Sequence, residues 1–248
     1  MLLRKKKHRS VFDVNNFDNT LHKNLSFTAR EQYKMLRTNI FFTLPDEVKC
    51  PVIGITSSTR GEGKSTTSIN LSYVMAESGK KVLLIDADLR LPSIAKKMKV
   101  SGSYGLSDIL LSGEVDNIEA FKSPVLQNWY ILPSGSIPPN PSELLGSAKM
   151  RRALKAFSEM FDFIIIDLPP VNIVTDALVA SELITGMVLV VREDYSDKRE
   201  LDDCVKRFKL SDVNVLGFVM NMDRDGSSSY GRYNKKKYSS YKYYKKQN

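Results

Sequence analysis

The residues best suited to chemistry stand in the stretch 58–66, which reads STRGEGKST. Gly61 and Gly63 allow the backbone to curl so that successive N–H groups face an anion. Lys64 adds a positive charge, and Ser65 offers a hydroxyl that can bind Mg²⁺. This P-loop pattern predicts a site for nucleotide phosphates at the start of a helix, with Lys64 facing solvent. The structural alternative is a glycine-rich turn that carries an exposed lysine.

Aspartates follow two further apolar stretches of the chain. Asp86 and Asp88 come after 82–85, and Asp167 comes after 163–166. Ligands bind at the carboxyl edge of a parallel sheet, and an aspartate that ends an apolar strand can hold Mg²⁺ through water. Alone, the first pair would be interpreted as caps of the next helix and Asp167 as a strand-end turn. Beside a P-loop, we expect all three to serve a site for ATP and Mg²⁺.

The elements that position these residues alternate between short apolar runs and segments of helical period. Several of the runs are apolar on consecutive residues, which is typical of parallel strands covered on both faces. The predicted strands are 51–56, 81–85, 129–132, 163–166, 187–191 and 213–220. The predicted helices are 28–44, 64–78 with an apolar stripe, 141 to about 160 with or without a break, and 196–208. This order predicts an α/β fold, a doubly wound and mostly parallel sheet with a P-loop NTPase core.

The net charge of +9 belongs to the two ends of the chain. Residues 1–9 carry five Lys or Arg and residues 230–248 carry seven, so the rest is close to neutral. The tail from 225 is low in aliphatic residues and rich in Ser, Lys and Tyr, and we expect it to be disordered. Its aromatic and basic residues would also suit nucleic acid, a partner that we consider unlikely beside the motifs above.

Cysteine use and hydropathy indicate an intracellular chain. Cys50 and Cys204 lie far apart and match no metal-ligand spacing, so we expect reduced, buried thiols. No apolar run approaches the ~20 residues that a membrane span requires. We therefore expect a soluble, cytoplasmic protein.

Together, these motifs resemble the bacterial tyrosine kinases of capsule and exopolysaccharide synthesis. The resemblance runs from about residue 28 to the C-terminus and includes 31–40 (EQYKMLRTNI), 105–110 (GLSDIL), 137–145 (IPPNPSELL) and the closing tyrosine cluster. It implies an ATP-dependent protein-tyrosine kinase that regulates the synthesis and export of such polysaccharides. It also implies three parts: a basic segment 1–27, a P-loop kinase domain 28–224 with a leading helix, and a tyrosine-rich tail 225–248.

The resemblance implies a role for each site residue. Asp86 would take the proton of the tyrosine, and Arg90 would steady the site. The expected catalytic residues are Lys64, Asp86, Asp88, Arg90 and Asp167, and the expected metal ligands are Ser65, Asp88 and Asp167. The expected ATP-binding residues are Thr59, Arg60, Gly61, Glu62, Gly63, Lys64, Ser65, Thr66 and, only by its position at the end of the last strand, Asn221. The sequence departs from the family at Leu168, where a threonine is expected.

The resemblance also implies the acceptors and the partners. The expected acceptors, modified in trans between subunits of a homo-oligomeric ring, are Tyr230, Tyr233, Tyr238, Tyr241, Tyr243 and Tyr244. Contacts in the ring would involve Glu31, Lys34 and Arg37, where Lys34 replaces the family's arginine. We expect the basic tail to be attracted by the three aspartates until phosphorylation reverses its charge. The other implied partners are a separate transmembrane activator of the polysaccharide co-polymerase type, which would recruit the chain to the inner face of the membrane, a cognate tyrosine phosphatase and protein substrates.

A partitioning or septum-positioning ATPase is the alternative from another functional class. Those relatives share the core and usually carry a lysine five residues before the P-loop lysine. Here that position is Thr59, and a tyrosine-rich tail has no role in such a switch. A scaffold that binds ATP without turnover is a weaker alternative.

Overall fold

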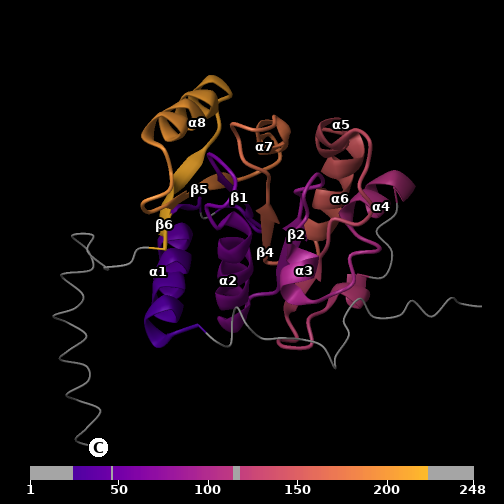
Figure 1. Ribbon diagram of the computed structural model, residues 1–248. Coiled ribbons are helices and arrows are strands. Elements are labelled where there is room, and N and C mark those ends of the chain that lie inside the picture. The colour runs from indigo at the N-terminus through magenta and orange to yellow at the C-terminus, as the bar shows by residue number, and fades with distance from the viewer. Residues whose placement is uncertain (1–24, 46, 114–117, 223–248) are drawn as a thin grey trace, which may run out of the picture.

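The computed structural model describes residues 25–45, 47–113 and 118–222 (Figure 1). The six expected acceptor tyrosines and the basic residues 1–9 lie outside the described residues, so the predictions made for them stay predictions.

Six strands form one parallel sheet in the order β3-β2-β4-β1-β5-β6. The strands are β1 (Val52–Ser57), β2 (Val82–Asp86), β3 (Trp129–Leu132), β4 (Phe163–Asp167), β5 (Gly186–Arg192) and β6 (Val215–Asn221). Every residue of β1 to β4 is buried, whereas the edge strand β6 is half exposed. The predicted parallel, doubly wound sheet is therefore confirmed, and cover on both faces explains why its strands read as continuous apolar runs.

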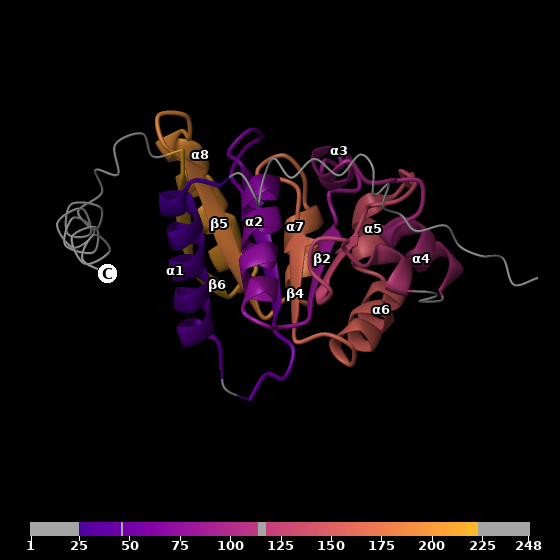
Figure 2. The same ribbon diagram turned by 90° about the horizontal axis from the view of Figure 1, so that it is seen from below.

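Helices cover both faces of the sheet (Figures 1 and 2). One face packs against α1 (Phe27–Thr43), α2 (Lys64–Glu77) and α3 (Ile94–Met98). The other packs against α4 (Leu106–Ser112), α5 (Pro141–Leu145), α6 (Ala148–Ser158), α7 (Asp176–Ser181), α8 (Lys198–Leu210) and the 3-10 turn η2 (Ile118–Phe121). Within the described residues, no helix is both long and apolar enough to cross a membrane.

One predicted helix contains the break that its prediction left open, and another differs from its prediction in how much of it is buried. The segment from 141 to 160 is broken between α5 and α6, where the Ser147 side chain caps α6 by accepting the Met150 N–H at 3.2 Å. Helix α2 buries nearly all its residues rather than one stripe, because α1 covers the side that the sheet leaves open. It ends before Gly79, which has a φ of 93° as expected for a helix C-terminus.

Candidate nucleotide-binding site

The ends of three neighbouring strands bring the predicted motifs together. Strand β4 lies between β1 and β2, and Asp86 is the direct partner of Asp167 in the β2–β4 register. The P-loop leaves the end of β1 beside them and leads into α2. A cavity of about 340 Å³ opens at this edge, between the P-loop, the turn after β2 and the turn after β4.

The P-loop depends on glycine at its turn into α2. Gly61 and Gly63 have φ values of 81° and 97°, a region that residues with a side chain rarely adopt. A Cβ at Gly63 would also collide with the side-chain amide of Asn221. Only glycine therefore allows this close approach between the P-loop and the end of β6.

Lys64 is an internal cation rather than a solvent-facing one, so that expectation is wrong. Its side chain is 13% exposed, and its Nζ lies 2.9 Å from Asp88 Oδ2 and 3.8 Å from Asp167 Oδ2. Burial alone would lower the pKa of Lys64, but the carboxylates of Asp167, Asp88 and Asp86 outweigh it and raise that pKa. The lysine is thus held charged on the floor of the cavity.

Asp86 and Asp88 have different environments despite their spacing. Asp86 is fully buried and does not line the cavity, because its Oδ2 accepts the N–H groups of Ser93 at 3.0 Å and Ile94 at 2.9 Å. Burial and the neighbouring Asp167 raise the pKa of Asp86 to about 7. Asp88 lines the cavity, and its Oδ1 accepts the N–H of Leu91 at 3.0 Å. The helix-cap interpretation therefore fits Asp86, while Asp88 is the carboxylate that a ligand meets.

Asp167 leaves one oxygen for a ligand. Its Oδ1 accepts a hydrogen bond from Ser68 Oγ at 3.1 Å, whereas its Oδ2 is buried without a hydrogen-bond partner. Burial raises the pKa of Asp167. Within the described residues, no group of three or more His, Cys, Asp or Glu could hold a metal ion. The donors that fit Mg²⁺ are therefore Asp167 Oδ2 and the Ser65 hydroxyl, with phosphate oxygens and water completing the shell.

Arg90 joins the turn after β2 to two helices. Its Nε and Nη2 donate to the buried carboxylate of Asp176 at 2.9 and 3.1 Å, and Nη2 also donates to Ser142 Oγ at 3.1 Å. Arg90 lines the cavity as well. It braces the site through Asp176 at the start of α7 and Ser142 in α5, which is consistent with a steadying role.

Several predicted ATP-binding residues do not line the cavity. Glu62 is fully buried, and Thr59 and Asn221 also lie outside the wall. Asn221 Nδ2 donates to the backbone oxygen of Glu62 at 2.8 Å, so this side chain is used by the P-loop itself. Sequence reasoning missed much of the opposite wall, which consists of Leu91, Ser93, Lys97, Pro169, Pro170, Ile173, Val174 and Met222. Pro169 and Pro170, which follow Asp167 after one leucine, were the one available signal.

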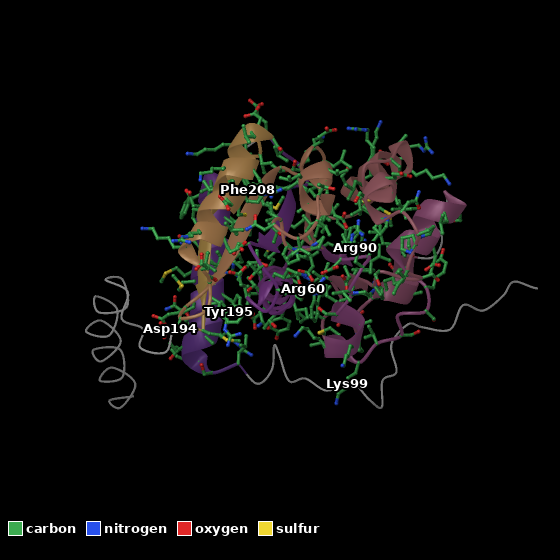
Figure 3. All side chains as sticks on the ribbon, turned by 45° about the horizontal axis from the view of Figure 1, so that its top comes forward. Arg60, Arg90, Lys99, Asp194, Tyr195 and Phe208 are labelled. Carbon is green, nitrogen blue, oxygen red and sulfur yellow. The ribbon has the colours of Figure 1, made fainter. Side chains whose placement is uncertain are left out.

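The cavity wall is basic rather than acidic. Its charged side chains are Asp88 and four cations, Arg60, Lys64, Arg90 and Lys97; Figure 3 labels Arg60 and Arg90. Asp86 and Asp167 are buried beneath the wall. The tail lies outside the described residues, so its expected attraction by the three aspartates stays a prediction. The cations of the wall would oppose that attraction in the protein without nucleotide.

The leading helix uses its charged residues within the chain. Lys34 Nζ lies 3.0 Å from Glu31 Oε1, and Arg37 Nη1 donates to the backbone oxygen of Val74 at 2.7 Å. Arg37 thereby satisfies a carbonyl in the last turn of α2. A role of this helix between subunits stays a prediction.

Comparisons with known proteins agree with this geometry. A family model described as an AAA domain matches residues 50–210. The tyrosine-protein kinase YwqD of Bacillus subtilis is 37% identical over 207 residues, which cover 83% of this chain and 86% of the relative. The solved kinase domain of the Escherichia coli tyrosine kinase ETK superposes with a TM-score of 0.77 at 30% identity, over 91% of this chain and 87% of that one.

The alternative ATPase class shares the fold less closely. The septum site-determining protein MinD of Pyrococcus horikoshii, solved with Mg-ADP, has a TM-score of 0.57 at 27% identity over 73% of this chain and 72% of its own. The chain is thus a P-loop protein with a nucleotide-binding fold. On the extent of the match to YwqD, it belongs to the bacterial tyrosine-protein kinases.

Proposed function

We propose that this chain transfers the γ-phosphoryl group of ATP to tyrosine hydroxyls of its own tail, 225–248. The observation that carries the proposal is Lys64, a largely buried cation placed between Asp88 and Asp167 on the floor of a cavity lined by the P-loop. Phosphoryl transfer depends mainly on alignment and on charge stabilisation, and this arrangement supplies both.

The P-loop and Lys64 bind the phosphates. Backbone N–H groups of 60–66 and the N-terminus of α2 face the phosphate chain, and Lys64 exchanges Asp88 for phosphate oxygens when ATP enters. Ser65 and Asp167 would hold Mg²⁺, joined by Asp88 once Lys64 has moved. The ion would supply charge neutralisation on the β- and γ-phosphates.

The tyrosine needs a proton acceptor, because its hydroxyl has a pKa near ~10. We assign this role to Asp86, whose pKa of about 7 suits a group that takes up a proton at neutral pH. Asp86 lies behind Asp88, so the turn 88–91 must shift to admit the phenol. The tyrosine oxygen then forms the new bond to phosphorus, the bond to ADP breaks, and the proton ends on Asp86.

Family membership supports the wider assignments. We propose that the tail of one subunit enters the site of its neighbour in a ring built with Glu31, Lys34 and Arg37. A transmembrane activator would hold the chain at the inner face of the membrane, and a phosphatase would reverse the reaction. Capsular or exopolysaccharide synthesis would be the regulated process. Bound ATP would offset the cations of the wall and so permit entry of the basic tail.

The test is phosphotyrosine formation by the recombinant chain with Mg-ATP, alone and with the cytoplasmic segment of a candidate activator. We expect weak labelling that the activator segment increases. Replacing all six tail tyrosines by Phe should abolish autophosphorylation. The matched control Tyr104→Phe, on a partly exposed tyrosine of the body, should label like wild type. ATP hydrolysis without any phosphotyrosine would instead favour the ATPase switch.

A further inference from the structure

Glu62 is an acidic side chain buried beneath a loop that binds anions. Its side chain is fully buried and does not line the cavity. A negative charge so close to the phosphate site opposes phosphate binding, and a buried carboxylate is stable only when hydrogen bonds satisfy it. The partners of Glu62 therefore indicate what it does.

Three donors surround the Glu62 carboxylate. Ser58 Oγ donates at 2.9 Å to Oε1 and lies 3.1 Å from Oε2, and the Thr59 N–H donates to Oε2 at 2.8 Å. These two close the P-loop on itself. The third donor, Ser196 Oγ, comes from the turn between β5 and α8 and binds Oε1. Because Ser196 Oγ accepts the Arg192 N–H at 2.8 Å, its own proton is free to point at Glu62.

The last residue of β5 and the turn that follows it also hold the outer side of the P-loop backbone. Arg192 Nη1 donates to the Gly61 carbonyl at 3.1 Å, and its guanidinium lies 4.6 Å from the centre of the Tyr195 ring. The Tyr195 hydroxyl lies 3.0 Å from the position that a Cβ on Gly61 would take, so the ring lies against this glycine. The next carbonyl, that of Glu62, accepts the amide of Asn221.

These contacts set the direction of the amides that face the phosphates. In a trans peptide the C=O and the following N–H point in opposite directions. The Gly61 carbonyl points towards Arg192, so the Glu62 N–H of the same peptide points away from Arg192. The Glu62 carbonyl points towards Asn221, so the Gly63 N–H points away from Asn221. Gly61 and Gly63 line the cavity, whereas Arg192 and Asn221 do not. Both N–H groups are thus aimed at the cavity side.

We propose that the Glu62 carboxylate, Arg192, Ser196 and Asn221 form an outer clamp that aligns the P-loop amides for the phosphates of ATP. Glu62 is a positioning residue in this clamp, held in place by Ser196 from the turn after β5. The inference rests on ATP being the ligand of the proposed function. ATP affinity then depends on a turn whose residues do not line the cavity.

The test is the equilibrium dissociation constant of the full chain for a fluorescent ATP analogue with Mg²⁺, beside the unfolding temperature. Ser196→Ala should raise that constant about tenfold, or about 1.4 kcal/mol. Ser196→Thr keeps the hydroxyl, so its dissociation constant should stay within about twofold of the wild-type value. Arg192→Met, which leaves the Gly61 carbonyl without its donor, should also weaken binding. The control is Ser158→Ala, whose hydroxyl bonds the Lys155 carbonyl far from the site and which should bind normally.

A purely structural role would give another result. Ser196→Ala and Arg192→Met would then lower the unfolding temperature and leave the dissociation constant unchanged, which would overturn the proposal. Equal weakening by Ser196→Thr and Ser196→Ala would also overturn it, because the hydroxyl would not be the active feature. The assay needs no phosphoryl transfer, so its failure leaves the kinase assignment untouched, and lack of phosphotyrosine leaves the clamp untouched.

Discussion

Replacing Lys64 by Met should destabilise the fold as well as abolish phosphorylation. Lys64 is the cation among three buried carboxylates, with Asp88 at 2.9 Å and Asp167 at 3.8 Å. Removing one partner of a buried ion pair costs about 3–5 kcal/mol. The Lys64 side chain is 13% exposed, so we expect a loss at the lower end of this range, about 3 kcal/mol in the free energy of unfolding at pH 8.5. This corresponds to a fall of about 6–12 °C in unfolding temperature for a domain of this size.

The destabilisation should depend on pH in a defined direction. The pKa of Asp86 is about 7 in the folded chain and near ~4 when unfolded. The unfolded chain therefore releases this proton first, and stability falls as the pH rises from about 4 to 7. Lys64 lowers the folded pKa of Asp86, so without it that pKa rises and the loss continues above pH 7. The difference in the free energy of unfolding between wild type and Lys64→Met should therefore be larger at pH 8.5 than at pH 5.5.

The assay is urea unfolding in EDTA without nucleotide, at several pH values between these limits. Lys206→Met is the matched control, because its ion pair with Asp202 is largely exposed and should contribute little. The double variant Lys64→Met with Asp88→Asn should regain part of the stability, since it also removes one of the stranded carboxylates. A loss below about 1 kcal/mol, or one that is the same at every pH, would refute the assignment of Lys64 as a buried counter-charge.

Two further predictions concern the P-loop and the bracing arginine. Gly63→Ala should weaken ATP binding at least tenfold in the fluorescence titration, because a Cβ there collides with Asn221; Gly79→Ala, with a similar φ and open space around it, should lose stability but bind ATP normally. Asp176→Asn breaks the bidentate contact with Arg90, so it should lower the free energy of unfolding by about 1 kcal/mol and reduce phosphorylation. If the free energy of unfolding and the phosphorylation were both unchanged, the bracing role of Arg90 would be contradicted.

The sequence by itself determined the elements and the type of site. Gly61 and Gly63 identify the P-loop because the turn needs positive φ values, and consecutive apolar residues identify strands that are covered on both faces. Asp86, Asp88 and Asp167 were recognised because a carboxylate that ends an apolar strand has few other uses beside such a loop. These signals are local, so they survive without knowledge of the fold. The short helices α3, α4 and α7 were not predicted, because so few residues show no clear helical period.

The tertiary structure decided what each residue faces. The strand order places β4 between β1 and β2, which brings Asp167 beside Asp86 and encloses Lys64. Asp86 and Asp88, two positions apart, separated into a buried cap and a cavity wall because the chain turns between them towards α3. The bond between Glu62 and Ser196 joins residues 134 positions apart. No local pattern encodes such a contact, because it exists only after the parallel strands have set the P-loop against the end of β5.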